Sequence, residues 1–383
     1  MKHHQYNADF QFVEQPKEFN KFTEKDILQF CLGATLYMPG TKVIADKIIN
    51  KSMTGLTSMV MCFEDAIREE LLEAAEKNVV DHFNILSDAI YHGKITYNEL
   101  PLIFLRVRNL EQFRSFSDKL TEEQAKILTG FVFPKFYSRN ANEYFSHLDE
   151  INQKLDVFLY GMPILEGHTI AYIETRCDEL LELKNIMESH HNKILNVRVG
   201  GTDFSSFFGV RRGINYSIYD ILTVRDCLSD ILNVLSREED DFTISGPVWE
   251  YFLAYKGDDL DHFLETKDIH SSLMTRTPII NAAIDGLLRE VVLDKANGFV
   301  GKTIIHPSHT KYVNAMQAVT KEEYDDAMQI VHTGGGVIKS LHSNKMNEIN
   351  PHYSWAKKII AKAYAYGVID DESAYLKLIL GKK

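Results

Sequence analysis

Short apolar runs recur along most of the chain, and each is followed by a longer stretch with helical spacing. The runs are rich in β-branched and aromatic residues and are bounded by turn residues, which is typical of strands. Most are apolar on both faces, as expected for parallel strands covered by helices outside and by a filled barrel interior inside. We count eight such runs: ATLYMP from Ala34, SMVMCFE from Ser58, LIFLRV from Leu102, TGFVFPK from Thr129, VFLYGMPILE from Val157, ILNVRVGGTD from Ile194, FTISGP from Phe242 and KTIIHP from Lys302.

The stretches between the runs have the spacing of amphipathic helices with charged outer faces. Examples are DAIREELLEAAEKNVVDHF after the second run and TRCDELLELKNIM after the fifth. This alternation predicts an α/β fold, a (β/α)₈ TIM barrel, which commonly occupies about 250 residues as one domain. Longer insertions follow the sixth and seventh runs, around GINYSIYDILTVRDCLSDIL and VWEYFLAYKGDDLDHFLETKDI.

The pattern changes after about residue 320, where helical stretches and a glycine-rich turn at residues 334–336 replace the alternation. The chain ends in a helical segment near SWAKKIIAKAYAYG. We therefore divide it into a (β/α)₈ barrel with an N-terminal lead-in over residues 1–320 and a C-terminal helical extension over residues 321–383. The extension is expected to pack on the barrel or on a neighbouring subunit.

Composition narrows the functional class. Hydrophobic residues make up 45% and charged residues 25% of the 383 residues, which is ordinary for a globular protein. The net charge of −12 and the lack of Lys/Arg clusters argue against a nucleic-acid partner. Four cysteines without CxxC spacing predict reduced thiols. The polar start MKHHQYNADF and the lack of an apolar run of roughly 18 residues predict no leader and no membrane span, and hence a cytoplasmic protein.

The residues that close the apolar runs are unusually polar. In barrels the active site is built at the carboxyl ends of the strands. A single acidic end is explained equally well by capping of the following helix. Three acidic ends, with basic residues on the strands between them, favour a converging site instead. The polar ends are Glu64 and Asp65, Arg106, Lys135, Glu166, Asp203 and His306.

Carboxylates with few histidines nearby favour a hard cation, Mg²⁺ or Mn²⁺, which takes one or two protein carboxylates plus substrate oxygens. We expect Glu166 and Asp203 to be the ligands, with helix capping as the alternative role of Asp203. In VGGTDFS the glycines Gly200 and Gly201 would let a substrate approach the backbone. Gly201 and Thr202 are therefore candidate substrate contacts.

A metal held in this way would chelate the keto and carboxylate oxygens of a 2-oxo acid and stabilise the charge that develops when the adjacent carbon bond breaks. Arg106 suits the free carboxylate, because its planar fork binds two oxygens at once. A structural ion pair with Glu64 or Asp65 is the alternative, and both roles can hold together. His306 is a candidate base, although its HP turn favours a role in ordering the loop.

At these strand ends the sequence resembles the HpcH/HpaI aldolase superfamily, which includes citrate lyase β-subunits and malyl-CoA lyases. Its motifs occur in the family's order, and it is most similar to the divergent branch called carbon–carbon bond lyases of the TIM-barrel fold. The motifs are LYMPGTK from Leu36 (like LFVPG), CFEDAIREE from Cys62 (like LEDAV), FLRVRN from Phe104 (like VRVN), FPK from Phe133 (like LPK), MPILE from Met162 (like P-x-x-E), VGGTDFSSFFG from Val199 (like G-x-x-D-L-x-x-x-L-G), GKTIIHPSH from Gly301 (like GKxxIHPxQ) and KMNEINP from Lys345 (like KMVDxP).

The resemblance implies a Mg²⁺ site from Glu166 and Asp203, a substrate carboxylate held by Arg106, and support from Glu64 and Asp65. It also implies reversible Claisen-type cleavage of a 3-hydroxyacyl thioester to an acetyl thioester and a 2-oxo acid, with a coenzyme A thioester as the candidate substrate. We further expect Lys135 to contact the substrate and the protein to form a homo-oligomer, a trimer or larger.

Two departures from the family pattern concern site residues. IETR, with Glu174, competes with Glu166 for the metal-ligand position; we prefer Glu166 because it closes the longer apolar run. Arg108 stands where VRVN has its asparagine. Alternate side chains of a strand face alike, so Arg106 and Arg108 are both expected to enter the site, which would suit a more acidic substrate.

The insertions containing RRGINYSIYD and SGPVWEYF are not typical of the better-known lyases and would reshape the thioester pocket. Two alternatives to a thioester lyase therefore stay open. One is a free-acid aldolase that produces pyruvate, and the other is a non-catalytic homologue that keeps the metal site.

Overall fold

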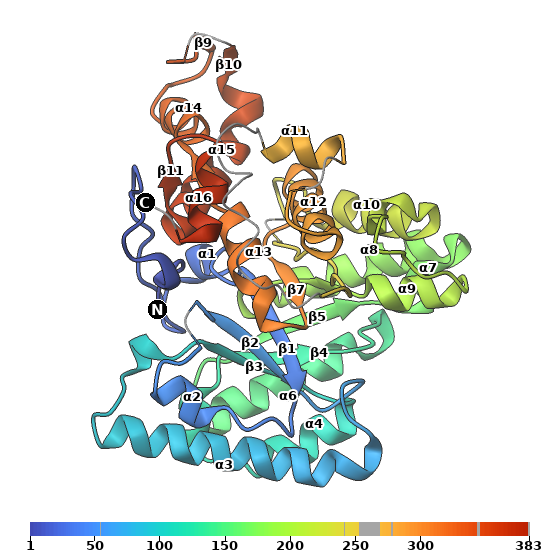
Figure 1. Ribbon diagram of the computed structural model, residues 1–383. Helices are drawn as coiled ribbons and strands as arrows, with labels where there is room; N and C mark the ends of the chain where they lie inside the picture. The colour runs from blue at the N-terminus through green and yellow to red at the C-terminus, as the bar shows by residue number, and fades with distance from the viewer. Residues whose placement is uncertain (54, 241, 253–268, 277–278, 343–344, 382–383) are drawn as a thin grey trace.

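The computed structural model describes residues 1–383 except 54, 241, 253–268, 277–278, 343–344 and 382–383. A parallel sheet of seven strands lies at its centre (Figure 1), in the order β6-β5-β4-β3-β2-β1-β7. Each begins within an apolar run of the sequence, because runs without polar positions suit strands covered on both faces. The strands are β1 (Ala34–Pro39), β2 (Ser58–Cys62), β3 (Leu102–Arg106), β4 (Gly130–Phe133), β5 (Tyr160–Leu165), β6 (Arg198–Val199) and β7 (Lys302–Ile304).

Residues 242–247, here called the closing segment, fill the eighth position between β6 and β7. Ile244 bridges Val197, next to β6, and Gly246 bridges Lys302 in β7, both in parallel. The run from Phe242 thus lies where the eighth strand of a barrel belongs, but as an extended segment instead of a regular strand. Pro247 lacks an N–H to donate, which limits the length of the ladder there. The expected barrel is confirmed.

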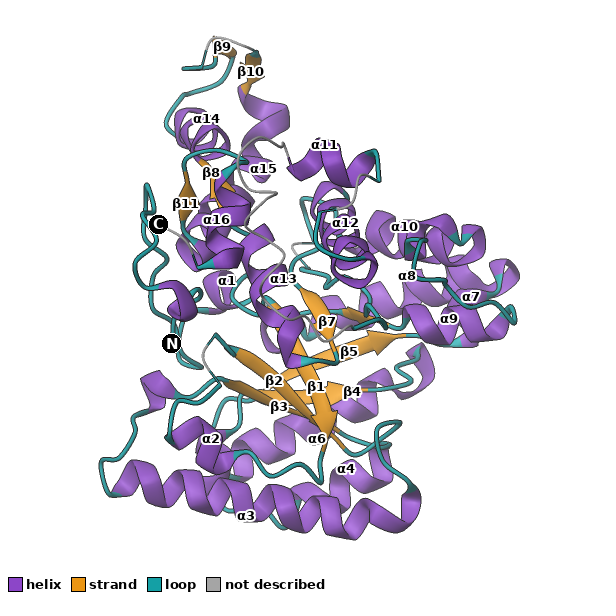
Figure 2. Ribbon diagram, in the orientation of Figure 1, coloured by secondary structure: helices purple, strands orange, loops and turns teal. Residues whose placement is uncertain are grey.

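Helices cover the outside of the sheet, with α3, α4 and α6 on one side and α8, α10 and α12 on another (Figure 2). They bury an apolar face against the strands and expose charged residues, as their spacing predicts. The helices up to α13 are α1 (Lys25–Leu28), α2 (Ala45–Ile49), α3 (Leu72–Tyr91), α4 (Leu110–Ser117), α5 (Glu122–Ile127), α6 (Ser138–Lys154), α7 (His168–Ala171), α8 (Ile173–Ser189), α9 (Gly201–Phe207), α10 (Leu222–Leu235), α11 (Ile269–Met274), α12 (Ala282–Ala296) and α13 (Thr310–Met316).

The insertion predicted after the sixth run contains α10. Most of the insertion after the seventh run, residues 253–268, lies outside the described residues. The first residues of this insertion are well packed. Trp249 is buried, and the Arg212 guanidinium lies over its ring, 4.6 Å from the centroid. A Cβ on Gly286 would lie 2.4 Å from that indole, so α12 approaches it closely.

The C-terminal part contains helices and two small sheets. Strands β8 (Val319–Thr320) and β11 (Val368–Ile369) pair in parallel, and β9 (Val337–Lys339) pairs antiparallel with β10 (Met346–Glu348). Helices α14 (Lys321–Val331) and α15 (Ile349–Tyr366) enclose a separate apolar cluster, whereas α16 (Ala374–Leu380) joins the main core. None of the helices in the described part of the chain combines the length and the apolar character that crossing a membrane requires.

Candidate active site

The carboxyl ends of the strands surround a cavity of about 590 Å³. In TIM barrels this is the end at which active sites are built. The last residue of β3 and residues that follow β2, β5 and β6 line the cavity together with the start of α9. Its polar lining consists of Tyr37, Asp65, Arg106, Glu166, Arg198, Thr202, Asp203, Ser206 and Thr303, beside the backbone of Gly200 and Gly201.

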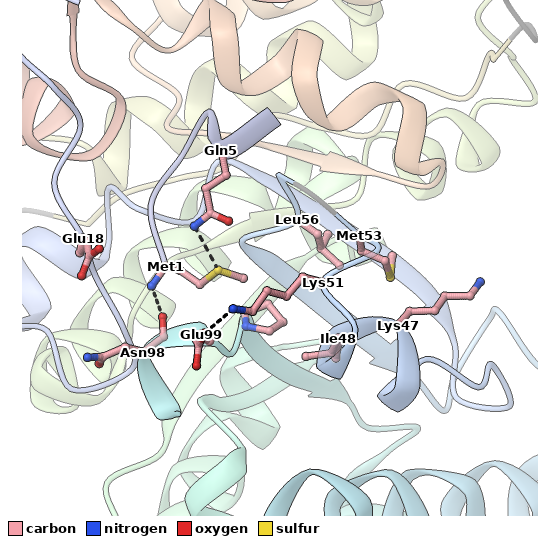
Figure 3. Close-up of a pocket in the computed structure, with 11 residues that line it drawn as sticks. Met1, Gln5, Glu18, Lys47, Ile48, Lys51, Met53, Leu56, Asn98 and Glu99 are labelled. Carbon is pink, nitrogen blue, oxygen red and sulfur yellow. Dashed lines mark hydrogen bonds and ion pairs between the residues drawn. The ribbon is translucent and has the colours of Figure 1, made fainter. Parts of the chain in front are cut away.

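A second cavity, of about 270 Å³, lies at the amino ends of β2 and β3, between Leu56 and Pro101 (Figure 3). One of its two lysines, Lys51, is already paired with Glu99 at 2.6 Å, and Figure 3 draws this ion pair. This cavity lies away from the polar strand ends, and its acidic residues are Glu18 and Glu99, the second of which Lys51 already neutralises. We therefore place the candidate active site at the carboxyl ends.

Lys135, just after β4, lies at the centre of the acidic residues. Its Nζ lies 2.9 Å from Asp203 Oδ1, 3.5 Å from Glu166 Oε1 and 3.5 Å from Glu64 Oε1. Asp65 Oδ2 lies 3.8 Å away. The Lys135 backbone has a φ of 47°, a left-handed conformation that is uncommon for lysine and that recurs at functional sites. The strand ends of β2, β4, β5 and β6 therefore converge.

Glu166, which follows β5, is 2% exposed. Its Oε1 accepts the Lys135 backbone N–H at 2.7 Å. Burial and, after it, the nearby Asp203 carboxylate raise the pKa of Glu166 to about 8, while the Lys135 ammonium opposes the shift. A buried carboxylate beside a second carboxylate favours a cation between them.

Gly200 brings the two carboxylates together. A Cβ at this position would lie 2.3 Å from Glu166 Cβ, 2.9 Å from Glu166 Oε2 and 3.0 Å from Asp203 Oδ2. Only glycine therefore permits the chain to pass Glu166 here. Asp203 then lies in the first turn of α9, where its carboxylate also suits the positive end of the helix.

Arg106 closes β3 and faces the same cavity. Its Nη1 lies 3.0 Å from Glu64 Oε2, its Nε donates to Cys62 Sγ at 3.0 Å, and its guanidinium lies 5.6 Å from the Tyr37 ring centroid. Its Nη2 has a longer contact with Asp65 Oδ2, at 3.9 Å. Burial raises the pKa of Glu64, while Arg106 and Lys135 oppose that shift. Glu64 thus fixes one edge of the Arg106 guanidinium, and the other edge lies near the cavity.

The structure brings together most of the residues singled out in the sequence: Glu64, Asp65, Arg106, Lys135, Glu166 and Asp203 contact one another, and Gly201 and Thr202 line the cavity.

Three other candidates lie outside the cavity lining. Arg108 Nη1 donates to the Phe63 carbonyl at 3.3 Å. Glu174 is exposed in the first turn of α8. His306 accepts the Ser308 N–H as a cap of the following turn and stacks on Phe252, with ring centroids 4.6 Å apart.

Ser206 on α9 escaped the sequence reasoning, and so did three strand residues of the cavity: Tyr37 on β1, Arg198 on β6 and Thr303 on β7. These three lie within the strands, whereas the search considered only strand ends. The sequence did offer a signal for Arg198, because it is the single charge in the run ILNVRV, and both faces of such a strand are expected to be covered.

A closed barrel whose strand ends present carboxylates, a lysine and an arginine to one cavity has the architecture of a TIM-barrel enzyme. The chain belongs to the family described as C–C bond lyase of the TIM-barrel fold, whose model matches residues 26–368. The family resemblance seen in the sequence is thereby confirmed, and the protein is a carbon–carbon lyase.

Solved structures share this fold. CitE from Mycobacterium tuberculosis, in complex with magnesium, acetoacetate and coenzyme A, has a TM-score of 0.51 and 16% identity, over 88% of this chain and 99% of that chain. A malate synthase from Haloferax volcanii has a TM-score of 0.50 and 12% identity, over 87% of each chain. No curated protein matches the sequence.

Proposed function

We propose that the protein is a Mg²⁺-dependent lyase that cleaves a 3-hydroxyacyl thioester, reversibly and in Claisen fashion, to an acetyl thioester and a 2-oxo acid. Glu166 and Asp203 would hold the ion, and Arg106 would hold the carboxylate of the 2-oxo acid. The observation that carries the proposal is the convergence of the Glu166 and Asp203 carboxylates beside Gly200.

The residues present fit Mg²⁺. One carboxylate oxygen of Glu166 and one of Asp203 both lie within 3.0 Å of the point that a Cβ on Gly200 would occupy. The Lys135 ammonium contacts the same two carboxylates, so the space between Glu166 and Asp203 favours a positive charge. Among the described residues no group of three or more metal-binding side chains gathers. Two carboxylates suit Mg²⁺, which keeps several waters and takes substrate oxygens.

When bound, Mg²⁺ would polarise the oxygens of the 2-oxo acid and offset the negative charge that develops there. Arg106 would bind the carboxylate through the edge that Glu64 does not use. Glu64 then acts as a positioning residue, because its contact at 3.0 Å fixes the guanidinium. Lys135 supplies a second positive charge beside the reacting atoms.

In the cleavage direction a base takes the proton of the substrate hydroxyl, and the carbon–carbon bond breaks as the new carbonyl forms. The bonding electron pair passes to the thioester enolate, which is protonated to the acetyl thioester. Asp65, the most exposed carboxylate of the group at 61%, lies beside Arg106 and Lys135 and supports the substrate end of the site. The thioester part of the proposal is supported by family membership and by the coenzyme A bound to the Mycobacterium protein.

The test of the metal site is a Mg²⁺ titration of the purified protein by calorimetry. Glu166→Gln and Asp203→Asn are each expected to weaken Mg²⁺ binding about tenfold or more, because each removes a charged ligand. Glu174→Gln is the matched control, since Glu174 is an exposed glutamate outside the cavity. Unchanged affinity in the first two variants, or a loss only in the control, contradicts the ligand assignment.

The reaction is tested by incubating the enzyme with Mg²⁺ and a panel of 3-hydroxyacyl-CoA thioesters and the matching free hydroxy acids. We expect a 2-oxo acid and acetyl-CoA from at least one thioester. A product formed only from the free acids would refute thioester cleavage and leave an aldolase.

A further inference from the structure

Arg198 is a buried cation inside the barrel that the proposed chemistry does not use. It belongs to β6, is 1% exposed, and lines the inner part of the cavity beside Tyr37 and Thr303. Its guanidinium lies 5.7 Å from the centroid of the Tyr37 ring, the ring that Arg106 also contacts. Arg198 and Arg106 therefore face the same cavity.

The hydrogen-bond partners of Arg198 are neutral. Its Nη2 donates to Thr303 Oγ1 at 2.6 Å. Its Nη1 donates to Ser245 Oγ at 2.9 Å and Thr35 Oγ1 at 3.3 Å, and has a long contact of 3.5 Å with Asn196 Oδ1. Its Nε has no hydrogen-bond partner among the described residues. These partners satisfy some donors but do not neutralise the charge.

The other buried arginines of the described chain are paired with carboxylates. Arg176 lies 2.9 Å from Asp230, and Arg212 contacts both Glu290 and Glu250. For Arg198 no ion pair with a carboxylate occurs among the residues that the structure describes. Arg198 is thus an exception within its own protein.

A buried charge is costly unless an opposite charge accompanies it. Burial accordingly lowers the pKa of Arg198, although the guanidinium stays charged. The position in the cavity lining means that a bound molecule can supply the missing negative charge. A planar fork of donors is suited to a carboxylate or a phosphoryl group.

We propose that Arg198 binds a second anionic group of the substrate at the inner part of the cavity. This inference rests on the proposed function and deepens it, because it makes the substrate dianionic. The 2-oxo acid end would lie at Glu166, Asp203 and Arg106, and the other end would carry a carboxylate or phosphoryl group toward Arg198. Arg198 would then select against substrates that end in an alkyl group.

Two pairs of probes isolate the second anion. 2-Oxoglutarate and 2-oxopentanoate differ by a carboxylate in place of a methyl group, and phosphonopyruvate and 2-oxobutyrate differ by a phosphonate in place of a methyl group. Calorimetry measures the dissociation constants of all four, with and without Mg²⁺. We expect the wild-type protein to prefer the dianion of at least one pair about tenfold or more, as a charge-assisted contact provides. The pair that shows the preference identifies the anion.

Arg198→Met should reduce that preference to near unity while leaving the binding of the mono-anions unchanged. Replacing a buried charge by an apolar side chain of similar length is often tolerated. Should this variant fail to fold, Arg198→Gln removes the charge while keeping hydrogen bonds to the surrounding hydroxyls. Arg176→Met, a buried arginine outside the cavity, is the control and should keep the wild-type ratio.

A wild-type ratio near one for both pairs would overturn the inference without the need for any variant. A preference that survives in Arg198→Met or Arg198→Gln would overturn it as well. Failure of the proposed metal site is recognised separately, because Mg²⁺ alone would then not bind the wild-type protein, and failure of thioester cleavage is recognised in the product assay described above. The ratios measured without Mg²⁺ still decide the role of Arg198 in that case.

Discussion

Gly200 matters to the candidate site because it has no side chain. Gly200→Ala would place a Cβ 2.3 Å from Glu166 Cβ and within 3.0 Å of both carboxylates. We expect this variant to lose about 1–3 kcal/mol of stability, as overpacking does, and to bind Mg²⁺ about tenfold or more weakly. The measurements are urea unfolding and calorimetric titration.

Gly334→Ala is the control for this change, since a Cβ at Gly334 meets open space and the backbone does not need glycine. It should leave both quantities at their wild-type values. If Gly200→Ala bound Mg²⁺ as the wild type does, the two carboxylates would not be the ligands.

At the level of single residues, the sequence predicted the acidic and basic strand ends because their position follows from the fold alone. Glu64, Lys135 and Asp203 needed only the rule that parallel strands end at one edge. Arg108 was expected to face like Arg106, but β3 ends at Arg106, so the strand alternation no longer applies beyond it. Arg198 was missed because nothing in a sequence states whether a buried charge has a partner.

Among the elements, the N-terminal lead-in differs most from what its polar sequence indicates. His3 stacks on Tyr366 of α15, with ring centroids 4.4 Å apart, and its Nε2 lies 2.9 Å from the Cys31 carbonyl oxygen. His4 Nε2 lies 3.0 Å from the Tyr366 carbonyl oxygen. Both histidines are buried, so the lead-in is fastened to the C-terminal part. Histidine occurs on surfaces and in cores alike, so the pattern MKHHQYNADF could not reveal this.

This packing makes stability depend on pH. Burial lowers the pKa of His4 from 6.5 to about 3. The unfolded chain therefore takes up a proton below pH 6.5 while the folded protein does not, so stability is full above pH 6.5 and is lost as pH falls toward 3. Between pH 6.5 and 5 we expect His4 to account for a loss of about 2 kcal/mol.

Urea unfolding of the wild type and of His4→Phe at pH 7 and pH 5 measures this contribution. The variant should lose less stability on acidification than the wild type does. His352→Gln removes an exposed histidine of α15 and should follow the wild type. An identical pH dependence in His4→Phe and the wild type would show that His4 is not the cause.

For the whole molecule, the closure of the barrel rests on few backbone contacts and on one buried ionic group. Lys302 in β7 is fully buried, and its Nζ lies 2.7 Å from Asp294 and 3.1 Å from Glu290 of α12. The barrel itself followed from counting eight apolar runs. The sequence did not predict that the closing segment pairs with its neighbours only weakly. Which hydrogen bonds Gly246 makes and Pro247 lacks depends on the pairing of the strands in three dimensions.

Lys302→Met would leave the buried Asp294 carboxylate without its cation and Glu290 with Arg212 alone. We expect a loss of about 3–5 kcal/mol in the free energy of unfolding, the cost of breaking a buried pair. Lys154→Met, which removes an exposed ion pair with Asp118, should cost at most about 1 kcal/mol. Chemical denaturation compares the two variants, and equal losses would mean that Lys302 does not hold α12 to the barrel.

The expected homo-oligomer and the division of the chain near residue 320 remain predictions at this scale. The apolar cluster between α14 and α15 is separate from the main core, yet α16 belongs to the main core. The extension therefore returns to the barrel instead of ending apart from it.

The side chain of Arg198 touches three neighbouring parts of the wall at the point of closure: Thr35 in β1, Ser245 in the closing segment and Thr303 in β7. An anion held by this guanidinium would be stabilised by the joined wall and would stabilise it in return, by the same free energy. Ligand binding in the cavity and closure of the barrel wall would therefore be linked equilibria. Release of the ligand and loosening of the wall would then favour one another.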